Sequence, residues 1–121
     1  MTEPIAYLKG QFVPASECVL PVYDLGIVLG AAVTDFLRTF HQKPCRMQDH
    51  IARFYRSCKY ARIEPSVDFE ESVAISEKLL AENSKLVPGE ELGLIYYMTA
   101  GEHTAYAGSA GVPQKKTATY V

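Results

Sequence analysis

The first side chains that could take part in chemistry lie on a predicted strand over residues 33–40 (VTDFLRTF). Its β-branched and aromatic residues favour a strand, in which side chains alternate between faces, so Thr34, Phe36 and Arg38 share one face. Because a planar guanidinium binds carboxylates well, Arg38 is a candidate for binding an acidic substrate group, directly or through water. An ion pair with an acidic residue, such as Glu102 or one outside this chain, is the structural alternative.

Arg53 is a second candidate, on a helix predicted from about Gln48 to Ala61. The apolar residues that recur at helical spacing and predict its buried stripe are Met47, Ile51, Phe54, Tyr55 and Cys58. Arg53 and Arg56 lie off this stripe. A guanidinium can hold a phosphate group by paired hydrogen bonds, but most helix arginines are solvated surface residues, and both interpretations stay open here. We expect His50 to be structural and to bond a neighbouring backbone group.

Two adjacent tyrosines lie on a predicted strand over residues 92–99 (LGLIYYMT). Neighbouring strand residues point to opposite faces, so one of Tyr96 and Tyr97 can reach a site while the other packs against helices. The strand is apolar throughout, which predicts a central position in a sheet. The following loop carries two weaker candidates, His103 and Tyr106.

The order of strands, two helices and strands predicts an α+β fold, with a mostly antiparallel sheet and both helices packed on one face. The other expected elements are two short strands within 6–13 broken at Lys9-Gly10, a strand end at 18–22, a helix over about 69–86, and a strand beginning at 116. Asp68 is expected to cap the second helix, with Glu71 at the third helical position. The inward face of that helix is expected to hold Phe69, Val73, Ser76 and Leu80, with Leu79 and Ile75 at its margin.

Composition narrows the class of protein further. A chain of 121 residues is one domain's worth, and its net charge of -2 and pI of about 5.9 give no reason to expect a nucleic acid or an anionic membrane as partner. No apolar run approaches the roughly 20 residues of a membrane span, and no secretory signal is expected. Three cysteines without a CxxC spacing argue against a disulfide framework or a metal site and indicate a cytoplasmic protein.

Four segments, taken in order, carry a family resemblance. Residues 7–13 (YLKGQFV) resemble a strand pair Y-x-N-G-x-x-V, and residues 24–38 (DLGIVLGAAVTDFLR) resemble D-R-G-[FY]-x-[FY]-G-D-G-V-[FY]-E-x-[IV]-[RK]. Residues 43–57 (KPCRMQDHIARFYRS) are similar to K-P-F-R-L-x-E-H-[LI]-x-R-L-x-x-S, and residues 94–101 sit where a core strand ends in T-R-G. Together they resemble the N-terminal small domain of class IV (fold type IV) pyridoxal-phosphate aminotransferases, a group that includes branched-chain and D-amino-acid aminotransferases and aminodeoxychorismate lyase.

This resemblance implies a cofactor and its site. It places pyridoxal phosphate between residues 1–121 and a larger C-terminal domain that bears the Schiff-base lysine and lies outside this chain, with homodimers as the usual assembly. It matches Arg53 to the arginine that holds the cofactor phosphate. It also aligns Thr34, Phe36 and Arg38 with positions that face an amino acid or 2-oxo acid substrate. No catalytic residue is then expected in this chain.

The chain departs from the family pattern at several positions. They are Lys9 where Asn is usual, Leu25 and Ala100 where Arg is usual, Ala31-Ala32 where Asp-Gly is usual, and Asp35 where Glu is usual. Losing two arginines removes possible ligands for a substrate carboxylate, so the family's substrate specificity cannot be transferred to this chain.

Three functions follow as alternatives. The first is amino-group transfer between an amino acid and a 2-oxo acid by a longer parent protein, with the chain alone inactive. The second is an aminodeoxychorismate lyase using the same cofactor. The third is a non-catalytic, stand-alone domain acting in assembly or ligand binding, because no cofactor lysine can be assigned here. Lys115 and Lys116 precede the position at which that lysine is expected.

Overall fold

A three-stranded antiparallel sheet forms the centre of the fold. In the computed structural model, which describes residues 3–102, its strands are β3 (Ala32–Phe40), β4 (Lys43–Pro44) and β5 (Gly93–Thr99). Their order is β4-β3-β5, and β3 and β5 pair over seven residues from Ala32↔Thr99 to Arg38↔Gly93. β3 is therefore the middle strand of this sheet.

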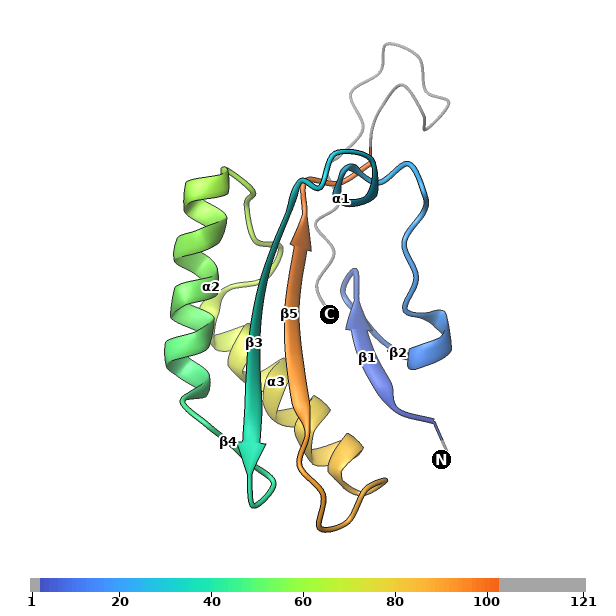
Figure 1. Cartoon of the computed structure of the whole chain (residues 1–121), viewed down its shortest axis with the longest axis vertical. Coiled ribbons are helices and arrows are strands. Elements are labelled where there is room, and N and C mark those ends of the chain that lie inside the picture. The colour runs from blue at the N-terminus through green and yellow to red at the C-terminus, as the bar shows by residue number, and fades with distance from the viewer. Residues whose placement is uncertain (1–2, 103–121) are drawn as a thin grey trace.

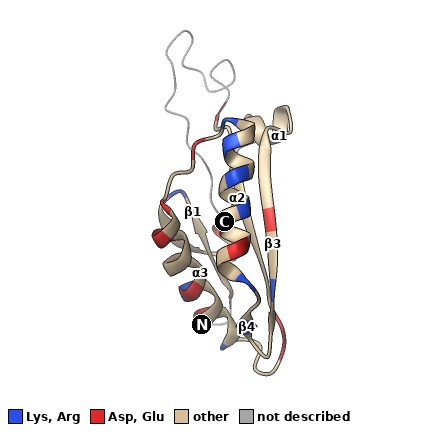
Figure 2. Ribbon diagram, turned by 90° about the vertical axis from the view of Figure 1, so that its left-hand side faces the viewer, with Lys and Arg blue, Asp and Glu red and all other residues tan. Residues whose placement is uncertain are grey.

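Two helices, α2 (Met47–Ala61) and α3 (Phe69–Ser84), lie on the same side of the sheet (Figure 1). A hairpin of β1 (Ile5–Leu8) and β2 (Gln11–Pro14) makes a separate two-stranded sheet that contacts α3. Within residues 3–102 neither α2 nor α3 lies on the other side of the three-stranded sheet, where only the short helix α1 (Leu25–Val28) packs at one end (Figures 1 and 2). The predicted α+β arrangement, with antiparallel strands and both helices on one face, is confirmed.

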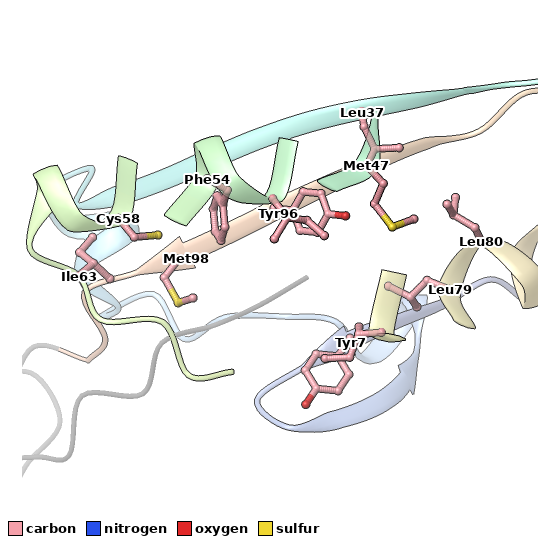
Figure 3. Packing of buried hydrophobic residues seen from close by; sticks show 12 residues of the cluster. Tyr7, Leu37, Met47, Phe54, Cys58, Ile63, Leu79, Leu80, Tyr96 and Met98 are labelled. Carbon is pink, nitrogen blue, oxygen red and sulfur yellow. The ribbon is translucent and has the colours of Figure 1, made fainter. Parts of the chain in front are cut away.

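The core lies between the helices and the inner face of the sheet. α2 buries Met47, Ile51, Phe54 and Cys58 of the predicted stripe, whereas Tyr55 at its margin is only partly buried. Phe54 packs on Tyr96 of β5 with 5.7 Å between ring centroids, and Met98 lies close by (Figure 3). The Tyr96 hydroxyl is satisfied inside this core by a 2.6 Å hydrogen bond with Ser76 Oγ of α3. Burial raises the pKa of Tyr96 to about 12, so its hydroxyl stays protonated.

One expectation about the strands is wrong. Residues 18–22 form no strand: the Asp24 N–H donates to the Pro21 carbonyl at 3.0 Å, and this turn leads into the short helix α1 (Leu25–Val28). Within residues 3–102 β5 pairs only with β3, so the expectation that it is a central strand stays a prediction. Its apolar residues do not require burial on both faces, since Ile95 is 49% exposed on the uncovered side. The strand expected from residue 116 lies outside the described residues.

No helix in residues 3–102 combines the length and the apolar content needed to cross a lipid bilayer.

The turn between β3 and β4 is held by a distant carboxylate. His41 and Gln42 both adopt positive φ, so their backbone N–H groups point to one side and donate to Glu91 at 2.6 and 2.9 Å. The Thr39 hydroxyl donates to the same carboxylate at 2.8 Å. These bonds, led by that from Gln42, hold the pKa of Glu91 below its usual value of 4.5.

Glu91→Gln is therefore expected to lower the melting temperature by a few degrees at pH 7. A carboxylate whose pKa is lower in the folded state stabilises the fold above its unfolded pKa, and this stabilisation is lost as the pH falls through the folded value. Thermal melts between pH 7 and pH 3 should show the wild type losing stability below about pH 4.5 more steeply than Glu91→Gln. Glu90→Gln serves as the control, and an equal response of both variants would contradict this role of Glu91.

Candidate functional site

The open face of the sheet carries the residues predicted to contact substrate. Thr34, Phe36 and Arg38 are exposed there, while Asp35 and Leu37 between them are buried toward the helices. The predicted alternation along β3 is therefore confirmed. Tyr97 pairs with Thr34 across the sheet and lies on the open face with it. It is thus Tyr97 that can reach this face, and Tyr96 that packs against the helices.

The Phe36 ring reaches over Gly93 of the neighbouring strand β5. A side chain added at Gly93 would come within 2.5 Å of the Phe36 ring, so the ring occupies the space that the glycine leaves. Phe36 nevertheless remains about half exposed. It forms an apolar surface on the open face that is fixed by the sheet itself.

Arg38 lies on the same face, near the C-terminal end of β3. Its Nε donates to the Thr39 carbonyl at 3.0 Å, and its guanidinium carbon lies 4.0 Å from the centroid of the Phe40 ring. Glu102, one predicted ion-pair partner of Arg38, pairs with Lys9 at 3.9 Å instead, so that pairing is wrong. An acidic partner from outside this chain stays a prediction. The terminal nitrogens of Arg38 make no hydrogen bond within the described part of the chain, although the guanidinium attracts the Glu91 carboxylate and helps to lower its pKa.

α1 packs at the other end of the open face, where the first residue of β3 pairs with the last residue of β5. Asp24 is fully buried and accepts hydrogen bonds from the Gly26 N–H at 2.7 Å and from the Thr99 hydroxyl at 3.1 Å. Gly26 leaves no room for a larger residue, since a Cβ there would lie 2.7 Å from Thr99 Cγ2. The Asp-x-Gly segment therefore attaches α1 to the end of β5. The apolar side chains Ile27 and Leu29 remain exposed beside it.

Arg53 makes a two-point ion pair with Asp35. Its Nε donates to Asp35 Oδ2 and its Nη2 to Asp35 Oδ1, both at 2.8 Å. His50 Nδ1 lies 2.9 Å from the same Oδ1. The Asp35 side chain is 3% exposed, whereas that of Arg53 is 58% exposed. The hydrogen bonds from the Arg53 guanidinium lower the pKa of Asp35. Burial of the carboxylate opposes this shift and the contact with His50 adds to it. Asp35 in turn raises the pKa of Arg53.

This cluster lies at the edge of β3 that is opposite β5 and precedes the residues paired with β4. The Thr39 N–H points to β5 and donates to Leu92, while the Arg38 carbonyl points the other way and accepts from Cys45. Phe36 is two residues before Arg38, so its N–H points to the same edge as the Arg38 carbonyl, away from β5. There it donates to Asp35 Oδ1 at 2.9 Å. Before Thr39 this edge has no strand partner among residues 3–102. The Asp35 carboxylate takes the place of a neighbouring strand there.

The predicted site residues are thus only partly brought together. Arg53 bonds to Asp35 and, within the described residues, makes no hydrogen bond or ion pair with Thr34, Phe36 or Arg38. The expectation that His50 bonds a backbone group is wrong, since its ring nitrogen contacts the Asp35 carboxylate. His103 and Tyr106 lie outside the described residues.

Asp35 itself was not predicted as a site residue. The signal in the sequence was an acidic residue on the helix-facing side of a strand, because a carboxylate buried there needs a cationic partner from the helix above it.

A shallow pocket of about 210 Å³ opens beside this cluster on the outer side of α2. Its lining residues are Arg46, Asp49, His50, Arg53 and Arg56. Arg46 is neutralised by Asp49 at 2.8 Å. Basic residues form a band along α2 in Figure 2. The pocket therefore offers Arg53 and Arg56 to an anion from solvent.

The Arg53 guanidinium fits a phosphate group. It has five N–H donors, of which Asp35 takes the one on Nε and one on Nη2. The second N–H of Nη2 lies near His50 Nδ1, which is 3.4 Å from Nη2, so the two donors on Nη1 remain, on a side chain that is more than half exposed. Charge-assisted hydrogen bonds from a held guanidinium are the usual means of binding a phosphate dianion. The phosphate end of a cofactor such as pyridoxal phosphate is therefore compatible with the residues present.

Comparison with curated proteins finds relatives among aminotransferases and a related lyase. No family model matches the chain. D-alanine aminotransferase of Staphylococcus aureus (strain MSSA476) is 30% identical over 90 residues, which cover 74% of this chain and 30% of that enzyme. Aminodeoxychorismate lyase of Bacillus subtilis (strain 168) is 30% identical over 77 residues, covering 64% of this chain and 26% of the lyase.

Solved structures agree at the level of the fold. The T.th. branched-chain amino acid aminotransferase, complexed with N-(5'-phosphopyridoxyl)-L-glutamate, matches with a TM-score of 0.78 and 20% identity over 99% of this chain and 40% of that chain. The Escherichia coli branched-chain amino acid aminotransferase matches with a TM-score of 0.77 and 17% identity, covering 98% of this chain and 38% of its own. The chain thus spans less than half the length of these relatives. It belongs to the class IV pyridoxal-phosphate aminotransferase family and has the α+β fold of the small domain of those enzymes.

Proposed function

We propose that this chain is the small domain of a pyridoxal-phosphate enzyme that transfers an amino group between an amino acid and a 2-oxo acid. The Schiff-base lysine would be supplied by polypeptide outside these 121 residues. The names of the relatives support this, since two solved structures of one relative hold N-(5'-phosphopyridoxyl)-L-glutamate and pyridoxamine 5'-phosphate. A homodimer in the cytoplasm is the proposed setting.

The described residues would bind the cofactor phosphate at one place and the substrate at another. Arg53 would bind and orient the cofactor phosphate at the free edge of β3. Thr34, Phe36 and Tyr97 would form a wall of the substrate site on the open face, and Arg38 would bind a substrate carboxylate through its terminal nitrogens. When bound, pyridoxal phosphate supplies an electron sink for chemistry at the α-carbon of the amino acid.

One observation carries this proposal: Arg53 is held by a buried carboxylate, and its side chain is still more than half exposed, with both donors of Nη1 unused within the described residues. A surface arginine without such a partner would be free to move and would bind phosphate weakly. The ion pair with Asp35 therefore favours a phosphate-binding role for Arg53 over that of a solvated surface residue.

Titration of the 121-residue chain with pyridoxine 5'-phosphate tests the proposal, because this probe has the phosphate but no aldehyde to react with surface lysines. Arg53→Ala is expected to weaken binding by roughly 10–100-fold, the equivalent of losing charge-assisted hydrogen bonds worth about 1.5–3 kcal/mol. Arg56→Ala, in the same pocket, should change the affinity less than about threefold, which is under 1 kcal/mol. Chemical shift changes in NMR spectra give both affinities. Equal effects of the two variants would show that Arg53 has no special role.

A lyase is the second candidate, favoured by the match to the Bacillus subtilis aminodeoxychorismate lyase. A protein that combines this chain with its lysine-bearing domain should be assayed with aminodeoxychorismate and with pairs of amino acids and 2-oxoglutarate. Release of pyruvate from aminodeoxychorismate without amino-group transfer would favour the lyase.

A further inference from the structure

We propose that Asp35 is the residue that positions Arg53 for phosphate binding, a role that rests on the proposed function. Asp35 would not touch the phosphate. It would act through Arg53, by holding the guanidinium in one orientation at the free edge of β3 before any ligand arrives.

The first support is the number of donors that converge on one carboxylate. Asp35 accepts from Arg53 Nε at 2.8 Å, from Arg53 Nη2 at 2.8 Å and from the Phe36 N–H at 2.9 Å, and His50 Nδ1 lies 2.9 Å away. These groups come from two elements, β3 and α2. A carboxylate bonded at four points cannot rotate without breaking several bonds, so it is a rigid anchor for the arginine.

The second support is the contrast in exposure across the pair. The Asp35 side chain is 3% exposed and that of Arg53 is 58% exposed. The anion is buried where its position is fixed, and the cation extends from it toward solvent. An ion pair made only for stability does not need an exposed partner that keeps unused donors, as Arg53 does on Nη1, whereas a ligand-binding arginine does.

The third support is the position of Asp35 on β3, the strand that also carries the proposed substrate-binding side chains. Asp35 lies between Thr34 and Phe36 on β3, and the backbone of Phe36 itself donates to it. The same strand carries the open face proposed to contact substrate. Asp35 therefore ties the position of the phosphate-binding arginine to the position of the substrate-binding side chains, although the two groups lie on opposite sides of the strand.

A double-mutant cycle tests this role with pyridoxine 5'-phosphate as the probe. Asp35→Asn keeps the shape of the side chain but removes its charge, and we expect it to weaken binding by roughly fivefold or more through loss of preorganisation. In an Arg53→Ala background the same substitution should change the affinity less than about twofold, because Asp35 acts only through Arg53. Asp35→Glu, which keeps the charge, should bind better than Asp35→Asn. Asp49→Asn is the matched control, since Asp49 pairs with an arginine of the same pocket but not with Arg53.

The outcomes separate this inference from the proposed function. If Arg53→Ala binds as tightly as the wild type, the proposed function is wrong. If Arg53→Ala weakens binding and Asp35→Asn does not, the function stands and Asp35 has no positioning role. Independent losses that add in the double variant would also overturn the inference.

A measurement without ligand covers the case in which Asp35→Asn weakens the fold. The Nε–H signal of Arg53 in ¹H–¹⁵N spectra should be sharp and slow to exchange in the wild type and in Asp49→Asn. It should broaden or exchange rapidly in Asp35→Asn at a temperature at which the backbone amide spectrum stays folded. An unchanged Nε–H signal would mean that Asp35 does not hold Arg53.

Discussion

Phe54→Ala is expected to lower the free energy of unfolding by roughly 3–5 kcal/mol, the usual loss for deleting a buried aromatic ring. Phe54 is fully buried in the layer between α2 and the sheet, and its ring packs against that of Tyr96 (Figure 3). Both the transfer of the ring from water and the cavity left behind contribute to the loss. Small domains have a total stability of about 5–15 kcal/mol, so this variant should be close to unfolding at 37 °C.

Urea denaturation followed by circular dichroism measures this loss. Tyr60→Ala is the matched control, because Tyr60 is an aromatic residue on the same helix but is 89% exposed. Its loss should stay within about 0.5 kcal/mol. Similar losses in the two variants would mean that α2 does not present the predicted face to the core.

The same pair of variants links the core to the proposed site. Phe54 follows Arg53 directly in α2, so the ring that anchors the helix also fixes the backbone from which the guanidinium extends. Phe54→Ala should therefore reduce pyridoxine 5'-phosphate binding even at temperatures where the chain is mostly folded. Tyr60→Ala should leave this binding unchanged.

The main strand and α2 could be predicted from the sequence because each follows a simple period. β3 alternates between exposed and buried residues from Thr34 to Phe40, and α2 buries residues three or four positions apart. The cap at Asp68 is confirmed by its hydrogen bond from the Glu71 N–H at 2.8 Å. Each of these features depends on residues that are close together in the chain.

The inner face of α3 was predicted less well. Phe69 and Val73 are only partly buried, whereas Ser72 is fully buried. The Tyr55 hydroxyl lies 2.6 Å from Ser72 Oγ, and Ser76 Oγ contacts the Tyr96 hydroxyl. A polar residue can occupy a core position when a partner from another element satisfies it, and such partners cannot be identified from helical spacing alone.

The pairing of Asp35 with Arg53 has the same explanation. The two residues are eighteen positions apart and meet only because α2 folds back over β3. Alternation places Asp35 on the helix-facing side, but the position of Arg53 beside the buried stripe of α2 does not say that its side chain reaches that carboxylate. The phosphate-binding role was assigned to Arg53 by resemblance, and the contact that would make this role effective required the tertiary structure.

Asp24→Ala is expected to cost roughly 2–3 kcal/mol and to release α1 from the end of β5. Asp24 combines the cap of a helix with a buried acceptor, so its removal leaves the Gly26 N–H and the Thr99 hydroxyl without their partner. Because the helix has only one turn, it cannot persist without this contact. Hydrogen exchange should therefore become faster in residues 25–29, while amides of the core strands remain protected.

Asp68→Ala provides a closely matched comparison, since Asp68 also caps a helix but is exposed. Its loss should be about 1 kcal/mol, without local unfolding of residues 25–29. Asp24→Asn keeps one oxygen as an acceptor and should fall between the two. If Asp24→Ala loses no more stability than Asp68→Ala, burial of the carboxylate does not attach α1 to the sheet. If it loses more and residues 25–29 open, the upper boundary of the proposed substrate face depends on this one side chain.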